Sequence, residues 1–430
     1  IGASGGLSEL LAMIASGNAD TATMIMMEVR LPRTLLALMI GATLGLAGAS
    51  LQGYLRNPLA DPYLLGLSSG ASLGAVSVLL LGAAILLPLA AFLEAHEACV
   101  FDAAKQELTV VVLCPVGSPN SALRAARTRA LELAARWSAA CAAPAPALPP
   151  AGAPALPLAV SFDEAGFVRA VARCQEYIAA GDTYQVNLST RLEVPAVDTL
   201  GAYEALRSAN PSPYMGFVRL PGVSLACGSP ELLVEVAGGR VASRPIAGTR
   251  PRGADEAADL AWARELSGDT KEKAEHLMLV DLLRNDVGRV SRPGTVRVPE
   301  FMAVERYSHV MHLVSQVEGD LAAGAGPADV VRALFPGGTV TGAPKVRTMQ
   351  VIAELEPVAR AYYTGSLGWV GASGELCLNI IIRSLWSAEG RAFVQAGAGV
   401  VADSVPAREY AESLRKAQAP LLAAARAALP

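Results

Sequence analysis

Two pairs of glutamates stand at a spacing that places their side chains on one face of a helix. Glu272 and Glu275 lie in a helix-like run over residues 271–290, and Glu409 and Glu412 lie in a second such run near the end of the chain. Residues three apart share a helix face, and carboxylate oxygens are ligands that Mg²⁺ prefers. From spacing alone, a solvated helix face is the more ordinary interpretation, because Lys416 follows Glu412 by four residues.

Two glycine groups could bind an anion. The stretch FPGGTVTGAPKVRTM carries a glycine-rich turn into a helix predicted to begin near Lys345, and QAGAGVVADS contains Gly397 and Gly399. Backbone N–H groups at such a turn and at a helix N-terminus form an anion cradle, although a plain tight turn explains glycines equally well. The turn lacks the GxxxxGK[ST] spacing of a nucleoside-triphosphate loop.

A histidine and an arginine-rich segment complete the candidates. His312 lies in the apolar, strand-like run HVMHLVSQV, where a core role is the ordinary interpretation and proton transfer near neutral pH is the alternative. The segment SRPIAGTRPRG, residues 243–253, combines three arginines with turn-forming residues and has the composition of a loop that meets an anion.

The elements that must position these residues follow from patterning. SFDE at 161–164 is typical of a capping box with Ser161 at the cap, and the helix it opens should end at Gly181. After it, strand-like runs come in succession without a helix between each, which favours an antiparallel α+β domain over an alternating one. Residues 108–113 are predicted to form a strand and residues 121–140 a helix.

Composition limits the classes of protein. The chain of 430 residues has room for two to three domains, and its net charge of −4 provides no basic field for nucleic acid. Its six cysteines form no CxxC pair, which fits reduced thiols in a cytoplasm and excludes a disulfide framework or a zinc site.

The hydrophobic excess lies at the front of the chain. Residues 34–55 and 62–93 are almost free of charge, and each run exceeds the roughly 20 residues that cross a bilayer. We therefore expect two membrane-like helices before the α+β domain, with a buried alanine- and leucine-rich helix of a soluble protein as the alternative. Residues 30–75 (LPR, LQG, then RNPLADPYLLGLSSGA) resemble the first membrane helices of ABC-importer permeases for iron-siderophores and cobalamin. The resemblance covers only the opening part of such a permease, too little to form a translocation path.

The remaining motifs resemble the chorismate-utilising enzymes. They are YQVNLSTR, NPSPYMGF, GSPELLV, RPIAGTRPRG, AEHLMLVDLLRNDVGRV, YSHVMHLVS, FPGGTVTGAPKVRTM and QAGAGVVADSVP, in this order, densely from residue 161 to the end. The resemblance implies a chorismate-binding fold of two antiparallel-rich sheets sandwiched between helices (αββα). It divides the chain into a partial permease-like segment (1–93), a remnant of the family's N-terminal domain (94–141), a Pro/Ala linker (142–160) and the catalytic domain (161–430).

The same resemblance implies the roles of individual residues. Glu275 and Glu412 would bind Mg²⁺, supported by Glu272 and Glu409, and the metal would neutralise one carboxylate of chorismate and help the ring hydroxyl leave. The positions that match the other substrate-binding residues are Glu231, Gly248, Tyr363, Arg383, Gly397, Gly399 and Lys416. Thr339 and His312 match residues near the reacting ring, with His312 as a candidate acid or base.

Gln185 and Ala247 bear on the product. Water-using members of the family carry Lys where this chain has Gln185, so ammonia is the expected nucleophile. QVNL and FPGGTVTGAPK resemble aminodeoxychorismate synthases, whereas anthranilate synthases tend to read QVVL and FPAGT. Ala247 stands where better-known aminodeoxychorismate synthases carry a lysine nucleophile, but a second group of them also reads PIAGT, and anthranilate synthases carry Ala there.

We therefore expect component I of an aminodeoxychorismate synthase, which makes 4-amino-4-deoxychorismate for para-aminobenzoate and folate synthesis. The resemblance implies a separate glutamine amidotransferase subunit that supplies ammonia. Anthranilate synthase component I is the alternative, and a truncated permease fragment or non-functional fusion is the second. The enzyme part is expected in the cytoplasm, with membrane association through residues 34–93.

Overall fold

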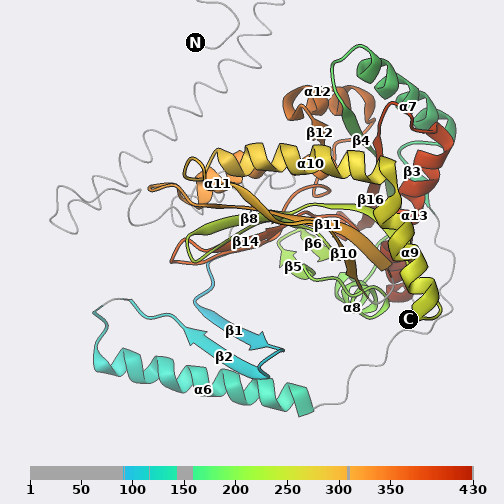
Figure 1. Cartoon of the computed structure of the whole chain (residues 1–430). Helices are drawn as coiled ribbons and strands as arrows, with labels where there is room; N and C mark the ends of the chain where they lie inside the picture. The colour runs from blue at the N-terminus through green and yellow to red at the C-terminus, as the bar shows by residue number, and fades with distance from the viewer. Residues whose placement is uncertain (1–90, 92, 116, 143–157, 308–309, 429–430) are drawn as a thin grey trace, which may run out of the picture. The chain divides into compact units, whose positions relative to one another are not determined.

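The computed structural model describes residues 91, 93–115, 117–142, 158–307 and 310–428 (Figure 1). Both predicted membrane-like runs fall outside these ranges, apart from residues 91 and 93. Within the described ranges, no helix is long and apolar enough to cross a membrane. The chain divides into two compact units, residues 1–145 and 146–430, which are described separately below.

The described part of the first unit is a hairpin and a helix. Strands β1 (Glu97–Asp102) and β2 (Glu107–Val112) pair antiparallel, and α6 (Asn120–Ala142) follows. The predicted strand and helix are thus confirmed. No residue of α6 is buried, and Val100 and Phe101 of the hairpin are exposed. A two-stranded hairpin has little stability of its own, and its packing against α6 leaves the described part of this unit largely exposed.

The second unit contains the helices that carry most of the predicted site. The described helical elements are α7 (Glu164–Ala179), α8 (Thr199–Ala209), α9 (Glu256–Gly268), α10 (Thr270–Gly288), α11 (Pro327–Leu334), the short 3-10 helix η2 (Gly338–Val340), α12 (Lys345–Leu355) and α13 (Pro406–Ala427). The predicted helices at 271–290 and from Lys345 are confirmed as α10 and α12. Helix α8, between β4 and β5, is not among the predicted elements.

Two seven-stranded sheets make up the rest of the unit. The β11 sheet has the order β10-β11-β8-β7-β14-β13 with β9 also paired to β11, and the β4 sheet has the order β12-β4-β16-β15-β6-β5 with β3 paired to β4. Every ladder is antiparallel, which confirms the predicted class. The β11-sheet strands are β7 (Leu232–Ala237), β8 (Arg240–Arg244), β9 (Ile246–Pro251), β10 (Arg297–Arg306), β11 (Val310–Asp320), β13 (Gly368–Val370) and β14 (Leu376–Asn379). The β4-sheet strands are β3 (Ala159–Val160), β4 (Gln185–Pro195), β5 (Gly216–Leu220), β6 (Val223–Cys227), β12 (Gly342–Ala343), β15 (Leu385–Ala388) and β16 (Arg391–Val400).

Each sheet buries a face against its own helices. Helix α10 lies along the β11 sheet (Figure 1), where Val280, Leu283 and Val287 pack with α11 and with β7, β8 and β11 in one core. Helices α7, α8, α12 and α13 cover the β4 sheet, with Phe167 and Val171 of α7 fully buried. The two glutamate pairs therefore sit on helices anchored to different sheets.

The start of α7 differs from prediction. The cap is Asp163, whose carboxylate accepts a hydrogen bond from the Gly166 N–H at 2.6 Å. Ser161 does not cap the helix, because its hydroxyl instead accepts the Arg191 N–H of β4 at 2.9 Å. The β4 sheet also takes in Ala159 and Val160, just before the predicted domain boundary at residue 161.

Candidate active site

The first glutamate pair lies at the N-terminal end of α10. Asp269 caps this helix by accepting the N–H groups of Lys271 and Glu272 at 3.0 and 3.1 Å. Arg250 of β9 pairs with the cap at 3.0 Å and with Glu272 at 3.5 Å. The cap and this arginine together fix the first turn of α10 against β9, and with it the direction of Glu272.

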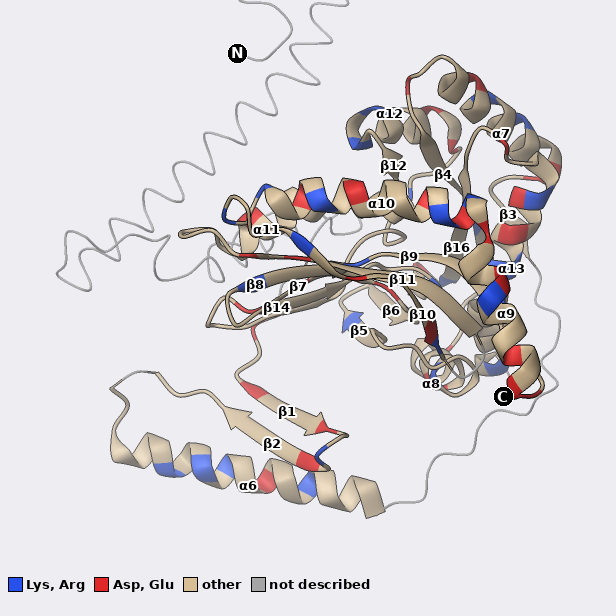
Figure 2. Ribbon diagram, in the orientation of Figure 1, with Lys and Arg blue, Asp and Glu red and all other residues tan. Residues whose placement is uncertain are grey.

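The second pair, Glu409 and Glu412, lies in the first two turns of α13, and Glu409 acts electrostatically on Glu275. Acidic residues are present on both α10 and α13 (Figure 2). Burial raises the pKa of Glu275 to about 7; Lys271 lowers it, and the negative charges of Glu272 and Glu409 raise it further. Burial also raises the pKa of Glu409, and the neighbouring Glu412 adds to the rise. The pKa values of Glu275 and Glu409 are raised even though Lys271 lies 3.7 Å from Glu275, because burial and the neighbouring carboxylates outweigh its charge.

A divalent cation at these four glutamates would need further ligands from outside the protein. No three His, Cys, Asp or Glu side chains converge tightly enough to hold a metal ion among the residues that the structure describes. Mg²⁺ commonly binds through one or two carboxylates, several waters and an anionic substrate. The carboxylate donors and their surplus charge suit that kind of site rather than a closed protein cage.

His312 is held by a bulge in the neighbouring strand. Residues Thr249 and Ala247 of β9 pair with His312 and Leu313 of β11, so Gly248 is an extra residue with φ +61°. The Nδ1 atom of His312 lies 3.2 Å from the Gly248 carbonyl oxygen and 3.1 Å from the Thr249 hydroxyl. Because a carbonyl only accepts, Nδ1 carries the hydrogen and Nε2 keeps the lone pair.

Burial lowers the pKa of His312 to about 4, with the Gly248 carbonyl opposing and the charge of Arg383 reinforcing the shift. The imidazole is therefore neutral at pH 7. Of the two roles considered for His312, this tautomer and charge favour the base or hydrogen-bond acceptor over the acid.

Gly248 also packs against the acidic end of α10. A Cβ at this position would lie 3.1 Å from Oε2 of Glu272 and 2.6 Å from a methyl carbon of Leu266. The left-handed backbone and the close approach both require glycine. One bulge thus brings His312 and a predicted metal-site glutamate to the same point.

Glu231 forms the centre of a second group of predicted residues. It is 6% exposed, and burial raises its pKa to about 7, against the lowering effects of Thr339, Lys416 and Arg383. The Thr339 hydroxyl lies beside the carboxyl without hydrogen-bond geometry and has no partner among the described residues. Arg383 has a left-handed backbone, φ +50°, a conformation that costs a non-glycine residue about 1–3 kcal/mol and is common at active sites.

Lys416 joins the two groups. Its Nζ atom lies 2.7 Å from the Glu412 carboxylate and donates a hydrogen bond of 3.2 Å to the Gly397 carbonyl oxygen. For Glu412, burial tends to raise the pKa, but the charge and hydrogen bond of Lys416 together with the charges of Arg415 and Lys271 outweigh it, so the net pKa is lowered. The ammonium therefore stands between the acidic face of α13 and the glycine strand β16.

Gln185 and the glycines of β16 form a third contact. A Cβ on Gly399 would lie 2.5 Å from Nε2 of Gln185, so this glycine makes the room that the amide occupies. Gln185 is 6% exposed, and its Oε1 atom has no hydrogen-bond partner among the described residues. A buried amide oxygen without a partner costs free energy, which is expected where a ligand supplies the missing donor.

Tyr363 lies in the same region. It is 6% exposed, its hydroxyl accepts a hydrogen bond from Nδ2 of Asn187 at 3.5 Å, and its pKa is raised mainly by burial with a small contribution from Glu231.

The arginines of SRPIAGTRPRG bind the protein's own carboxylates. Arg250 holds α10 as described, Arg252 pairs with Asp259 of α9 at 2.7 Å, and Arg244 pairs with Glu300 and Glu305 of β10. The impression of an anion-binding loop is therefore wrong: these side chains anchor β9 to its neighbours. Thr249 and Arg250 are site-supporting residues that sequence reasoning did not single out.

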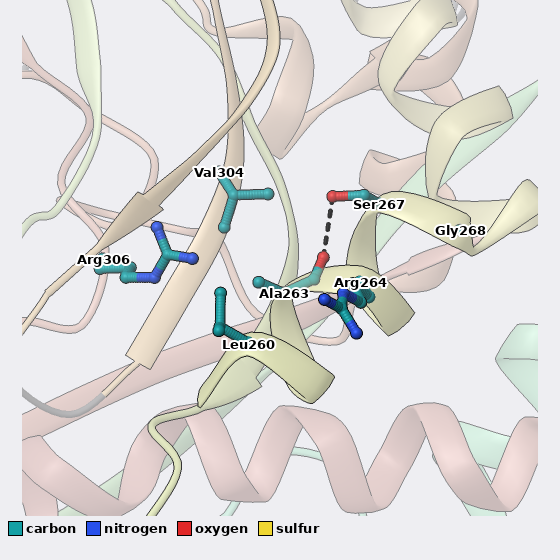
Figure 3. Close-up of a pocket in the computed structure, with 7 residues that line it drawn as sticks. All are labelled: Leu260, Ala263, Arg264, Ser267, Gly268, Val304 and Arg306. Carbon is teal, nitrogen blue, oxygen red and sulfur yellow. Dashed lines mark hydrogen bonds between the residues drawn. The ribbon is translucent and has the colours of Figure 1, made fainter. Parts of the chain in front are cut away.

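A surface groove lies apart from these groups. It is open and lies between α9 and β10 (Figure 3), and it is lined by Leu260, Ala263, Arg264, Ser267, Gly268, Val304 and Arg306. None of the predicted site residues lines it. The site is therefore assigned from contacts and charge rather than from this groove.

Comparison with known families places most of the chain in one family. A family model described as "chorismate binding enzyme" matches residues 76–422. This chain belongs to the chorismate-binding enzyme family. A second model, the FecCD transport family, matches residues 2–109. The resemblance of the front segment to a transport family is thereby confirmed.

Two relatives and one solved structure illustrate the similarity. Aminodeoxychorismate synthase component 1 of Bacillus subtilis is 55% identical over 260 residues, which cover 60% of this chain and 55% of the relative. Anthranilate synthase component 1 of Streptomyces coelicolor is 48% identical over 347 residues, 79% of this chain and 68% of the relative. The crystal structure of anthranilate synthase component I from Streptococcus pneumoniae aligns with a TM-score of 0.67 at 36% identity, covering 76% of this chain and 72% of that one. The chain thus spans little more than half the length of the Bacillus relative.

Proposed function

We propose that this chain is component I of an aminodeoxychorismate synthase, which converts chorismate and ammonia into 4-amino-4-deoxychorismate and water. In this reaction a C–N bond forms, the C–O bond of the ring hydroxyl breaks, and the hydroxyl leaves as water after gaining a proton. One observation supports amination. Gln185, at the position where water-using relatives carry a lysine, is a buried amide whose Oε1 atom lacks a hydrogen-bond partner among the described residues.

An amide suits ammonia rather than water as the nucleophile. Gln185 cannot take a proton near neutral pH, so it would not activate water as a lysine amine does at this position in water-using relatives. Its free oxygen can instead accept a hydrogen bond from an N–H of ammonia and orient it. The room made by Gly399 keeps the amide in place.

Glu231 is suited to protonate the leaving hydroxyl. A general acid works best when its pKa lies near the working pH, and burial places the pKa of Glu231 at about 7. His312, neutral and with its Nε2 lone pair free of the Gly248 bond, is suited to accept a proton from the reacting ring or the incoming amine. Arg383 and Lys416 carry the charges to bind a substrate carboxylate, Arg383 through two parallel hydrogen bonds.

Mg²⁺ is part of the proposal, with Glu275 and Glu412 as its ligands and Glu272 and Glu409 supporting them. When bound, it would neutralise a carboxylate of chorismate and stabilise charge on the departing oxygen. The surplus negative charge on α10 and α13 supports this assignment.

Ala247 removes one route. A methyl side chain cannot attack the ring, so ammonia must add without a covalent enzyme intermediate at this position. Ammonia would come from a separate glutamine amidotransferase subunit, since the relatives' names describe each as component 1 of its synthase.

Anthranilate synthase component I is the second candidate. Ala247 is the residue that anthranilate synthases carry, and the Thermus thermophilus enzyme of that name is 54% identical over 263 residues. Identity to the Bacillus aminodeoxychorismate synthase is nearly the same, so sequence similarity alone separates the two products poorly.

Product identification tests the proposal. The chain is incubated with chorismate, MgCl₂ and ammonium at pH 8, and the products are separated by chromatography and identified by mass. We expect aminodeoxychorismate, dependent on Mg²⁺. Anthranilate, recognised by its fluorescence, as the sole product would establish the second candidate, and no product with either nitrogen position would reject both.

A further inference from the structure

A buried ion pair lies next to the candidate site and takes no part in the reaction as assigned above. Arg360 follows α12 in the chain and pairs with Glu356 at its end, with the two side chains only 14% and 3% exposed. Its Nε and Nη2 atoms donate to the two carboxylate oxygens of Glu356 at 2.9 and 2.6 Å. Two charges this deep carry a desolvation cost that a pair of apolar residues would not, so their contacts need an explanation.

The arginine's other bonds go to backbone atoms of two site elements. Nη1 donates to the carbonyl oxygen of Val340 at 2.8 Å, in η2 directly after Thr339, and Nη2 donates to the carbonyl oxygen of Asn187 at 2.5 Å, in β4 two residues after Gln185. The guanidinium also lies 5.5 Å from the ring centre of Tyr363. A guanidinium has five N–H groups in a rigid plane, and Arg360 uses it to join three segments.

The carboxylate extends the network to the glycine strand. Glu356 Oε1 accepts the Ser189 N–H at 2.9 Å and the Ser189 hydroxyl at 2.7 Å, and that hydroxyl accepts Nε2 of Gln395 at 2.9 Å. Ser189 stands opposite Gly397 in the ladder between β4 and β16. The ion pair therefore contacts β4, which carries Gln185, η2, which carries Thr339, and the ring of Tyr363. Through Ser189 it also reaches the residue opposite Gly397 in β16.

The turn that follows Arg360 holds strain that needs such an anchor. Ala361 and Thr364 are non-glycine residues in left-handed backbone conformations, with φ +49° and +64°. The turn is closed by the Tyr363 N–H, which donates to the Arg360 carbonyl oxygen at 3.0 Å, and by the Thr364 N–H, which donates to Ile381. Left-handed non-glycine residues persist where the surroundings over-determine them, and Arg360 is at the start of this turn.

We propose that Arg360, held by Glu356, is a positioning residue that sets the placement of Thr339 and Tyr363 in the active site. It acts through the backbone of η2 and β4 and through its position against the ring of Tyr363. The kinetic part of this inference rests on the proposed function, whereas the structural part does not. Lysine cannot replace it, because a single ammonium cannot reach Glu356, Val340 and Asn187 in the same plane.

Hydrogen exchange measured by mass spectrometry tests the structural part. In Arg360→Lys, amides in residues 337–343 and 360–365 should exchange about tenfold faster than in the wild-type chain, while those of β6 and β15 stay unchanged. Arg391→Lys is the matched control, because Arg391 pairs with Glu193 at 3.0 Å at the other end of the same β4–β16 ladder. Glu356→Gln keeps an acceptor for Ser189 but removes the charge, and it should reproduce the effect should the lysine variant fold poorly.

Kinetics test the catalytic part. Arg360→Lys should lower kcat/KM for chorismate roughly 10- to 100-fold, the cost of misplacing groups by about 1 Å, and Arg391→Lys should not. In a chain that carries both Thr339→Ala and Tyr363→Phe, adding Arg360→Lys should cost little more, because the arginine acts through these two residues. A further loss as large as that of Arg360→Lys alone would overturn the positioning role, as would unchanged exchange in both segments. A third outcome separates the two parts. If Arg360→Lys alters exchange but the wild-type chain makes no product from chorismate, the proposed function is rejected and the positioning role stands.

Discussion

Glu275→Gln should make the metal-free protein more stable at alkaline pH while abolishing its activity. Burial and the neighbouring glutamates raise the pKa of Glu275 from an ordinary 4.5 to about 7. The folded state therefore retains a proton that the unfolded chain has already released. Stability falls as pH rises from about 4.5 to 7, and above pH 7 the full cost of the buried charge is present.

The size of the effect follows from the shift. A difference of about 2.5 pKa units (7 minus 4.5) corresponds to roughly 3 kcal/mol at 1.36 kcal/mol per unit. The side chain is 24% exposed, and solvent screening brings the expected gain to about 2 kcal/mol at pH 8. At pH 5 the folded carboxyl is protonated and the pH lies only slightly above the unfolded pKa of 4.5, so the gain should fall below about 1 kcal/mol.

Urea unfolding followed by tryptophan fluorescence measures this gain. The experiment is run on the wild-type chain and on the variant at pH 5 and pH 8 with EDTA, and Trp386, fully buried in the β4 sheet, reports on the second unit. Glu176→Gln, at a 62% exposed glutamate on α7, serves as the control and should shift neither value. Equal gains at the two pH values, or a loss of stability at pH 8, would refute the reasoning. Millimolar Mg²⁺ should reduce the difference at pH 8 by stabilising only the wild type.

Three further outcomes are expected. His312→Gln should lower kcat about 10²- to 10⁴-fold. The pH profile of wild-type activity should show no change due to His312 between pH 5 and 8, because the pKa of His312 lies at about 4. A variant with the wild-type rate would show that His312 takes no part in the reaction. Gln185→Lys should introduce a hydroxylated product beside the aminated one, detectable by chromatography without ammonium, and a product mixture that remains purely aminated would show that the amide does not select the nucleophile. Gly397→Ala should destabilise the protein by about 1–3 kcal/mol, since its Cβ would lie 2.5 Å from the Leu188 carbonyl oxygen. Gly399→Ala should cost less, because its Cβ would meet the movable side-chain amide of Gln185. Thermal unfolding should therefore give a lower Tm for Gly397→Ala than for Gly399→Ala.

Local patterns predicted the elements well and the capping less well. Length and periodicity predict the helices α10, α12 and α13, and the succession of strands predicts antiparallel sheets. The cap of α7 did not follow, because Ser161 and Asp163 can both accept a backbone N–H, and only the position of β4 decides that Ser161 bonds to Arg191. A choice between two local partners is settled by tertiary contacts that no short motif contains.

The chemistry of individual residues was predictable only by resemblance. Spacing alone favoured a solvated surface for Glu275, whereas burial and neighbouring carboxylates give it a raised pKa. Likewise, Arg250 looked like a ligand for an external anion, but Asp269 and Glu272, some twenty residues later, occupy it. The network around Arg360 gives no sequence signal, since two of its partners are backbone carbonyls 20 and 173 residues away in the chain.

The bulge at Gly248 separates what the fold needs from what the reaction needs. Because Ala247 and Thr249 already face consecutive residues of β11, a chain lacking Gly248 could keep the same strand pairing on both sides. It would lose the carbonyl oxygen that holds the hydrogen of His312 on Nδ1. The length of this stretch therefore matters to the placement of His312 as much as the identity of residue 247 matters to the nucleophile.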